Sequence, residues 1–491
     1  MRREGPRLVA IFHVKLRRPS AQLVLEATAA FALLWVIARA CLQSITIDEA
    51  DTYLCWVAKP DPSHWSPASN NHLLNSLLMR LFISLFGLSH LTARAPALIG
   101  AAVYIAMAYL LCRRVAGESR LAWPLLVCLV YNPMVMDHLV AARGYSLALA
   151  FLMVALSTIA SGRFDVRACA ICSACAALSM AGNLSFALVN AVMMGAVLVI
   201  ACVRTPALRD RLRLFGACTL PGLAVSLFLT AHEVLHFPRD ELRYGARSLR
   251  AMFLSVRESS LFRLNPQIVH PTLFGLIEVL TPYLLPALLA LAAWQFRRRQ
   301  PAFAYLLVGV LAAAICGHWV LFRLFHVLLP LDRTAIWLVP LVTLTIGAVA
   351  VNRRALTVMV YAMSIYFVLC LRLHYFKEWE WDADVQDVYP VLAWYNHMYG
   401  VRDIASNWQY GAALNFYRLQ SGRETLEEIP SPVDKQGGHA IYVLNYEFDQ
   451  DFAKQQRLHA VYHGRTTDIV VAVREGVESA HNSFRAADPV N

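Results

Sequence analysis

Two acidic residues, Asp48 and Glu49, follow directly after the first long apolar run, in the segment IDEAD at positions 47–51. A carboxylate among apolar residues at a membrane surface loses hydration free energy unless it is paired with a cation or used in a reaction. The reaction that one such carboxylate can serve is proton abstraction from a hydroxyl group, which is general-base catalysis. The alternative is structural, because an acidic residue also stabilises the start of a helix.

Polar residues of the outer segments form a second set of candidates, and the arginines and histidines among them could hold an anion. Arg143 lies inside an apolar run, where a guanidinium group must either reach the membrane surface or meet an anion. Arg333 follows Asp332, so a local ion pair between these two is the alternative to a role in binding. The candidate substrate-binding residues are His72, Asp137, His138, Arg143, Tyr145 and Arg333.

The composition is that of an integral membrane protein. Of the 491 residues, 58% are apolar and 16% are charged, and the mean hydropathy is +0.49. Soluble domains have about 45–50% apolar and about 25% charged residues, so a disordered chain, a disulfide-stapled secreted scaffold and a cytosolic enzyme are excluded. The net charge of +11 does not indicate nucleic acid as a partner, because a basic membrane part is followed by an acidic tail.

Eleven apolar runs approach the length of about 20 residues that a helix needs to cross a bilayer. They lie near 21–41, 94–112, 121–136, 139–160, 167–182, 184–203, 214–231, 270–296, 301–322, 334–351 and 355–373. Lys and Arg in short loops mark the cytoplasmic side, which puts the N-terminus in the cytoplasm and residues 374–491 outside it. We therefore expect an α-helical polytopic membrane domain of about 11 helices over residues 1–373, with long outer loops at 42–93 and 232–269.

The outer segments carry weaker signals of structure. Residues 73–88 of the first long loop predict a helix lying on the membrane, and the basic amphipathic pattern at 242–257 predicts another in the second loop. That second helix would be either a cover over the bundle or a mobile lid that meets lipid phosphates. The tail, 374–491, contains the strand-like stretches HAIYVLNY and TTDIVVAVRE, which predict a small extracytoplasmic α/β domain that supports binding rather than chemistry.

Several stretches of the chain, taken in order, resemble one family of membrane enzymes. They are ITIDEADTYLCW, then LFGLSHLTARAP, then ARGYSLALAF, and the likeness extends through LPLDRTAIWLVPL to NWQYGAALNFYR. In order and spacing they are similar to the GT-C superfamily of membrane glycosyltransferases, and within it to the group related to protein O-mannosyltransferases and the lipid A aminoarabinose transferase. The chain departs from that pattern at NNHL, positions 70–73, where many members carry a Lys-Pro-Pro segment.

The resemblance implies a glycosyltransferase that takes its sugar from a polyprenyl-phosphate donor in the bilayer. It implies transfer, with inversion, to an acceptor hydroxyl of a lipid, glycan or protein on the periplasmic face of the bacterial inner membrane. Asp48 would be the catalytic base, with Glu49 beside it. A glycosidase normally needs two carboxyl groups, whereas a sugar on a lipid phosphate already has a good leaving group. One carboxylate therefore suffices, provided that cations neutralise the departing phosphate.

Two alternatives stay open at this point. A polytopic transporter or flippase for a lipid-linked glycan would share this composition, although transporters tend to place polar sites near the middle of the bilayer on broken helices. A divalent metal ion serves some members of the superfamily. However, Asp48, Glu49, Asp51 and Asp137 form no ligand pattern, so no metal site is predicted.

Overall fold

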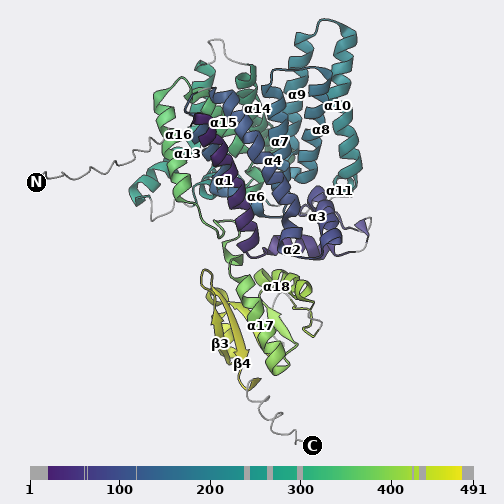
Figure 1. Ribbon diagram of the computed structural model, residues 1–491, viewed down its shortest axis with the longest axis vertical. Coiled ribbons are helices and arrows are strands. Elements are labelled where there is room, and N and C mark those ends of the chain that lie inside the picture. Colours follow the sequence, from purple (N-terminus) through teal and green to yellow (C-terminus); the bar gives the residue numbers. More distant parts are fainter. Residues whose placement is uncertain are drawn as a thin grey trace, which may run out of the picture.

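The structure is a computed structural model that describes residues 20–59, 61–62, 65–117, 119–236, 244–262, 269–295, 302–422, 425–430 and 438–477. The predicted cytoplasmic leader, the start of the amphipathic pattern at 242–243 and the end of the tail lie outside these residues. A bundle of apolar helices is followed by a small domain with a sheet, which packs against one end of the bundle (Figure 1).

Six helices of the described residues are long and apolar enough to cross a membrane, judged by length and composition. They are α1 (Ala21–Leu42), α4 (His90–Ala116), α9 (Ala187–Arg204) with the short η3 (Leu184–Phe186) before it, α10 (Leu208–Leu229), α13 (Pro271–Gln295) and α14 (Ala302–Phe325). The pair α5 (Ala122–Val130) and α6 (Pro133–Val140), bent by 57°, would form a seventh span if the two helices count as one. The chain is thus a multi-pass membrane protein, as predicted.

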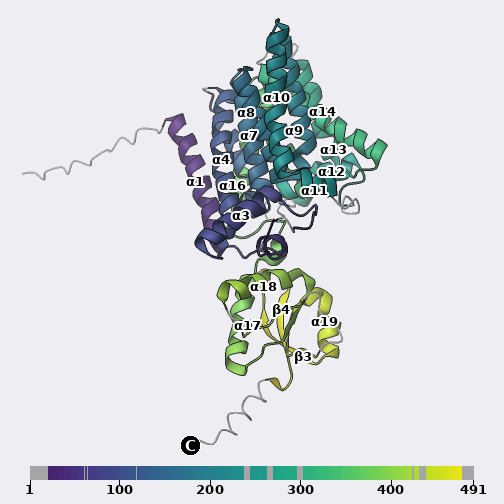
Figure 2. The ribbon, with the colours of Figure 1, turned by 90° about the vertical axis from the view of Figure 1, so that its right-hand side faces the viewer.

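The other predicted runs contain shorter apolar helices. These are α7 (Tyr145–Ala160), α8 (Val166–Gly182), α15 (Leu338–Ala350) and α16 (Arg354–Leu369). Helices α4, α7, α8 and α10 lie side by side in that order (Figures 1 and 2). Every predicted run contains a helix, but the count of eleven full spans stays a prediction.

One predicted run, 139–160, begins its helix late because Gly144 interrupts it. The backbone of Gly144 has a φ of +72°, a conformation that residues with a Cβ rarely adopt. A Cβ atom at this position would also lie 2.0 Å from the carbonyl oxygen of Gly182 in α8. The residues just before α7 therefore run as an irregular segment, which carries Arg143 beside α2.

Short helices gather at the end of the bundle that faces the sheet domain (Figures 1 and 2). α3 (Leu73–Phe86) forms where the sequence predicts an interfacial helix, and α12 (Leu249–Ser260) forms in the second long loop. The hydroxyl of Ser248 caps α12 by accepting from the N–H of Ala251. The remaining short elements are α2 (Ile47–Thr52), the π-helix η1 (Tyr53–Val57), α11 (Ala231–His236), η5 (Asp332–Ala335) and η6 (Glu380–Asp382).

The C-terminal domain has a four-stranded mixed sheet with helices on both faces. The strand order is β1-β2-β4-β3, with β1 parallel to β2 and the other pairs antiparallel. Along β2, Val443 faces the side of α17 and α18, whereas Tyr442 faces Phe452 of α19. The elements are α17 (Val385–Tyr399), β1 (Ile404–Ser406), α18 (Trp408–Ser421), β2 (Ile441–Asn445), α19 (Tyr446–Gln455), β3 (Leu458–His463) and β4 (Ile469–Arg474).

This domain and the end of the bundle that faces it share one hydrophobic core. Ile45 and Ala50, which flank the start of α2, belong to the same buried cluster as Leu414 and Phe416 of α18. The hydroxyl of Tyr417 in α18 accepts a hydrogen bond of 2.8 Å from the N–H of Ile45. The predicted fold class, a polytopic helical membrane protein with a small C-terminal α/β domain, is confirmed.

Candidate active site

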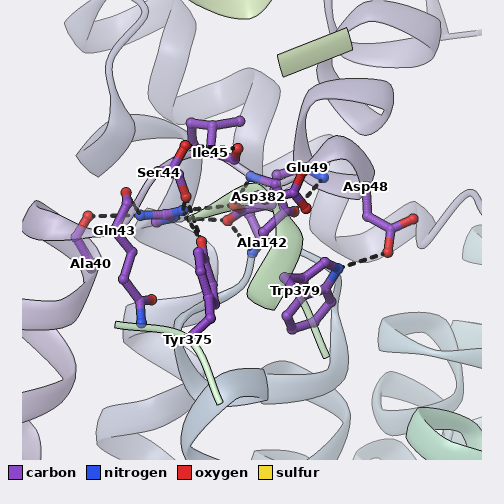
Figure 3. Close-up of polar contacts among 12 residues, drawn as sticks. Ala40, Gln43, Ser44, Ile45, Asp48, Glu49, Ala142, Tyr375, Trp379 and Asp382 are labelled. Carbon is purple, nitrogen blue, oxygen red and sulfur yellow. Dashed lines mark hydrogen bonds and ion pairs between the residues drawn. The ribbon is translucent and has the colours of Figure 1, made fainter. Parts of the chain in front are cut away.

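Helix α2 presents Asp48 and Glu49 to different surroundings. Thr46 caps this helix: its hydroxyl accepts from the N–H of Glu49 at 3.1 Å, and its own N–H donates to the Glu49 carboxylate at 3.0 Å. This reciprocal capping box fixes the side chain of Glu49 against the start of the helix. Because neighbouring helical residues are rotated by about 100°, Asp48 points to another side, toward Trp379 (Figure 3).

Glu49 forms a closed ion pair with Arg94 of α4. The guanidinium group donates to both carboxylate oxygens, at 2.8 and 2.7 Å, and both side chains are buried. The N–H of Ala142 is a further donor to Glu49, at 2.8 Å. Burial alone would raise the pKa of Glu49, but Arg94 lowers it. Arg94 also donates to the main-chain oxygens of Ala40, Gln43 and Ser44. This pairing favours a structural role for Glu49, which joins α1, α2 and α4.

We expect Glu49→Gln to lower the stability of the folded protein. Breaking a buried ion pair leaves the guanidinium of Arg94 without its counter-charge, at a typical cost of about 3–5 kcal/mol. The measurement is the apparent melting temperature of the detergent-solubilised protein, followed by the loss of its monodisperse elution peak. Glu428→Gln, which changes an exposed carboxylate, is the matched control. Equal melting temperatures for the two variants would contradict the structural role.

Asp48 lies between two arginines. Its Oδ2 atom accepts from Nη1 of Arg333 at 2.6 Å and from the indole N–H of Trp379 at 3.0 Å, while Nη2 of Arg143 lies 3.7 Å from Oδ1. The residue is 9% exposed. Burial alone would raise the pKa of Asp48, but the two guanidinium groups lower it well below its usual range. A carboxylate held in this way is ionised. A bound anion would compete with it for Arg143 and Arg333.

The two arginines differ in how firmly the protein holds them. Arg143 is buried and donates to Thr52 at 2.9 Å, to the main-chain oxygen of Asp48 at 3.1 Å and to the side chain of Asn70. Arg333 is more exposed, and its hydrogen bond to Asp48 is joined by a longer ion pair with Glu378. Arg333 can therefore turn toward a ligand more readily than Arg143. Asp332 pairs with Lys377 at 3.3 Å, so the local Asp332–Arg333 pair does not form.

His72 and His138 converge on Tyr145 beside this group. The ring centroids lie 5.4 Å (His72) and 4.8 Å (His138) from that of Tyr145. Both rings are buried, and within the described part of the chain the Nε2 atom of each lacks a hydrogen-bond partner. Unpaired buried polar atoms are rare in folded proteins. Because both rings also lie close to Asp48, their Nε2 atoms are candidates for hydrogen bonds to a ligand.

The surroundings of the two rings set complementary roles for these free nitrogens. Nδ1 of His138 faces the carbonyl oxygen of Met134 at 2.7 Å, so it must carry the proton, and Nε2 is left as an acceptor. Nδ1 of His72 accepts from the amide of Asn183 at 3.2 Å, because the oxygen of that amide is held by Ser185. Burial, aided by Arg143 and Arg333, lowers the pKa of His72, so its ring is neutral and Nε2–H is a donor.

Asp137 lies apart from this group and has partners of its own. Its carboxylate forms a buried ion pair of 2.5 Å with Arg39 of α1 and accepts from the N–H of Phe376 at 3.3 Å. Arg39 lies over the ring of Phe376, with 4.9 Å from Cζ to the ring centroid. The pairing favours a structural role for Asp137, which fastens the segment after α16 to the bundle.

Three residues of that segment lie at or near the site but are not among the residues predicted for it. Trp379 bonds Asp48, Glu378 lies 3.8 Å from Arg333, and the buried Asp382 accepts from the N–H of Ile47 at 3.2 Å. The available signal was KEWEWDAD, a cluster of acidic and aromatic residues directly after the last apolar run. Among the described residues, no group of three or more His, Cys, Asp or Glu side chains could hold a metal ion.

Comparison with known proteins reveals a likeness of fold. No protein-family model and no curated protein matches the chain. The crystal structure of ArnT from Cupriavidus metallidurans in the apo state matches with a TM-score of 0.50 and 14% identity, covering 92% of this chain and 97% of that one. The structure of the same protein bound to undecaprenyl phosphate matches with a TM-score of 0.48 and 14% identity, covering 93% and 98%. The predicted resemblance to the GT-C group that includes the lipid A aminoarabinose transferase is thus confirmed at the level of the fold.

Proposed function

We propose that this protein transfers a sugar from a polyprenyl-phosphate donor to an acceptor hydroxyl at the periplasmic face of a bacterial inner membrane. One observation carries the proposal: the carboxylate of Asp48 is buried between Arg143 and Arg333, next to two histidine nitrogens that have no partner among the described residues. The cations can stabilise the negative charge of a departing phosphate, and the carboxylate can accept the proton of an attacking hydroxyl.

The two arginines link binding of the donor to the basicity of Asp48. Without a ligand, Asp48 neutralises Arg333 and is therefore a weak base. A donor phosphate that takes over Arg333 would remove the cation with the shortest contact to Asp48, at 2.6 Å against 3.7 Å for Arg143. The pKa of the carboxyl group would then rise toward its ordinary range, where it accepts a proton more readily. The base is thus released only when the leaving group is in place.

The reaction then needs one proton transfer and one displacement. The acceptor oxygen attacks the anomeric carbon of the sugar, its proton passes to Asp48, and the bond between that carbon and the phosphate oxygen breaks. Attack comes from the face opposite the phosphate, so the product has the inverted configuration. A sugar hydroxyl that donates to Nε2 of His138 and accepts from Nε2–H of His72 would complete the hydrogen bonding of both rings.

The test is transfer by the purified protein in detergent, using a panel of undecaprenyl-phosphate sugars with single radiolabelled sugar groups. Transfer of label to a lipid, glycan or protein acceptor from the host membrane supports the proposal. The competing function is transport of a lipid-linked glycan. Movement of the labelled donor across proteoliposomes, without release of undecaprenyl phosphate, would favour that function instead.

The proposal also requires that the C-terminal domain lies in the periplasm, on the side where Asp48 is. The charge distribution of the loops predicts this orientation, and α18 contacts the segment that carries Asp48. Alkaline phosphatase fused to the C-terminus should therefore be active in cells. An inactive phosphatase, with fluorescence from a cytoplasmic reporter fused at the same place, would contradict the assignment of both faces.

A further inference from the structure

Glu378 is a second carboxyl group at the proposed donor site, and its segment is fastened on both sides. The N–H of Phe376 donates to Asp137, and the indole N–H of Trp379 donates to Asp48. Between these two anchors, the Glu378 side chain is 11% exposed and its Oε1 atom lies 3.8 Å from Nη1 of Arg333. The same Nη1 atom donates to Asp48 at 2.6 Å, so one guanidinium group serves two carboxylates.

Arg333 is the one cation that forms an ion pair with Glu378 within the described ranges of the chain. The neighbouring Lys377 is occupied, since it pairs with Glu258 and Asp332 at 3.3 Å each. The other ionisable groups near Glu378 are acidic or phenolic: Asp332, Asp137, Tyr145 and Tyr244. Glu378 therefore depends on Arg333 for its counter-charge more than Asp48 does, because Asp48 also has Arg143 and Trp379.

A phosphate that binds Arg333 changes this balance. Two guanidinium groups would then face three anions, namely Asp48, Glu378 and the phosphate. An unbalanced charge in a buried site is removed most cheaply by a proton, since burial disfavours the ionised form of a carboxyl group. The carboxylate with the weaker hold on Arg333 takes that proton, and the two distances, 3.8 Å against 2.6 Å, identify it as Glu378.

We propose that Glu378 takes up a proton when a lipid phosphate binds Arg333, and that it thereby makes donor binding dependent on pH. This inference rests on the proposed function, because it needs a lipid phosphate as ligand. Glu378 acts through Arg333 and is a positioning residue: its ionised form attracts the guanidinium group, and its neutral form leaves that group to Asp48 and the phosphate. Burial, against the opposing effect of Arg333, raises the pKa of Glu378 to about 7, so Glu378 is only partly protonated near neutral pH before a lipid phosphate binds.

The sign of the effect follows from linkage. A complex that takes up one proton on forming becomes weaker as the pH rises, by up to about tenfold in Kd per pH unit above the pKa of Glu378 in the free protein. Glu378→Gln removes this proton and keeps the size of the side chain. The ratio of the wild-type Kd to the Glu378→Gln Kd should therefore rise between pH 7 and pH 9. Ionisation of the ligand itself is common to both proteins and cancels in the ratio.

The experiment is calorimetric titration of the full-length protein in nanodiscs with undecaprenyl phosphate, at several pH values and in two buffers of different ionisation enthalpy. Wild type should take up more protons per bound ligand than Glu378→Gln, by up to one. Glu378→Asp, which keeps an ionisable group, should restore part of the pH dependence. Glu380→Gln, two residues along the same segment, should behave as wild type.

Three results would overturn the inference, and they separate it from the proposed function. Binding with the same proton uptake and the same pH profile in wild type and Glu378→Gln removes the role of Glu378 but leaves the donor class intact. A pH profile that Glu380→Gln shifts equally would show a general effect of charge in the segment. Absence of undecaprenyl phosphate binding by folded wild type at every pH would overturn the inference together with the proposed donor.

Discussion

Replacing Asp48 with asparagine should lower the turnover rate of sugar transfer by about 10²–10⁴-fold, the usual loss when a general base is removed. The amide keeps the size of the carboxylate and can still accept the hydrogen bond from Trp379, but it cannot take a proton. The fall should therefore appear in kcat. Binding of undecaprenyl phosphate should not weaken, because the variant removes the anion that competes for Arg333.

The matched control for this variant is Asp51→Asn, which changes another carboxylate of the same short helix. The side chain of Asp51 forms no ion pair with either arginine among the described residues, so this variant should keep most of the activity. Near-normal kcat in folded Asp48→Asn would refute its assignment as the base. A product with retained anomeric configuration would refute direct displacement, whichever residue is the base.

Replacing Arg333 with alanine should weaken binding of undecaprenyl phosphate by roughly tenfold to a hundredfold. This range corresponds to the loss of one hydrogen bond to a charged group, about 1.5–3 kcal/mol. Arg333→Lys should recover little of that affinity, because an ammonium group cannot reproduce the planar donor geometry of a guanidinium. Both Kd for undecaprenyl phosphate and KM for the sugar donor report the effect.

Arg209→Ala is the control for Arg333→Ala, since it removes an exposed guanidinium from α10. Its affinity for undecaprenyl phosphate should equal that of wild type. Unchanged affinity in Arg333→Ala would shift the phosphate to Arg143. The Arg143→Ala variant would then be expected to lose both binding and stability, because Arg143 also holds Thr52 and Asn70.

The sequence predicts that several residues of the candidate site lie together, because the predicted topology places all of them at the same end of the bundle. Asp48, Arg143 and Arg333 are far apart in the chain, yet the loop charges assign each to the outer end of an apolar run. The structure brings their side chains within ion-pair distance. The hydropathy pattern predicts at which end of its helix a residue lies. Polar residues at the same end of a compact bundle are then brought close to one another.

The sequence does not show which of two adjacent acidic residues faces the candidate site and which has a structural role. Asp48 and Glu49 are both acidic and stand side by side in the sequence. They differ in the structure because Arg94 of α4 binds Glu49. One local signal was available: Thr46 and Glu49 have the spacing of a capping box, which marks Glu49 as the structural member. The partner of Asp137 is Arg39 in α1. No periodicity links these two residues, because their contact is set by helix packing.

The bond between Trp379 and Asp48 spans 331 positions of the chain, and this separation has a consequence for biosynthesis. Asp48 is synthesised before Arg333 of η5 and before Trp379 of the segment after α16, whose side chains both bond its carboxylate. Contacts of such long sequence separation form late in folding. Every copy of the protein therefore remains without a completed site until Trp379 has been synthesised and has packed beside Asp48. Premature termination before position 379 would yield membrane-inserted chains in which Asp48 lacks this partner.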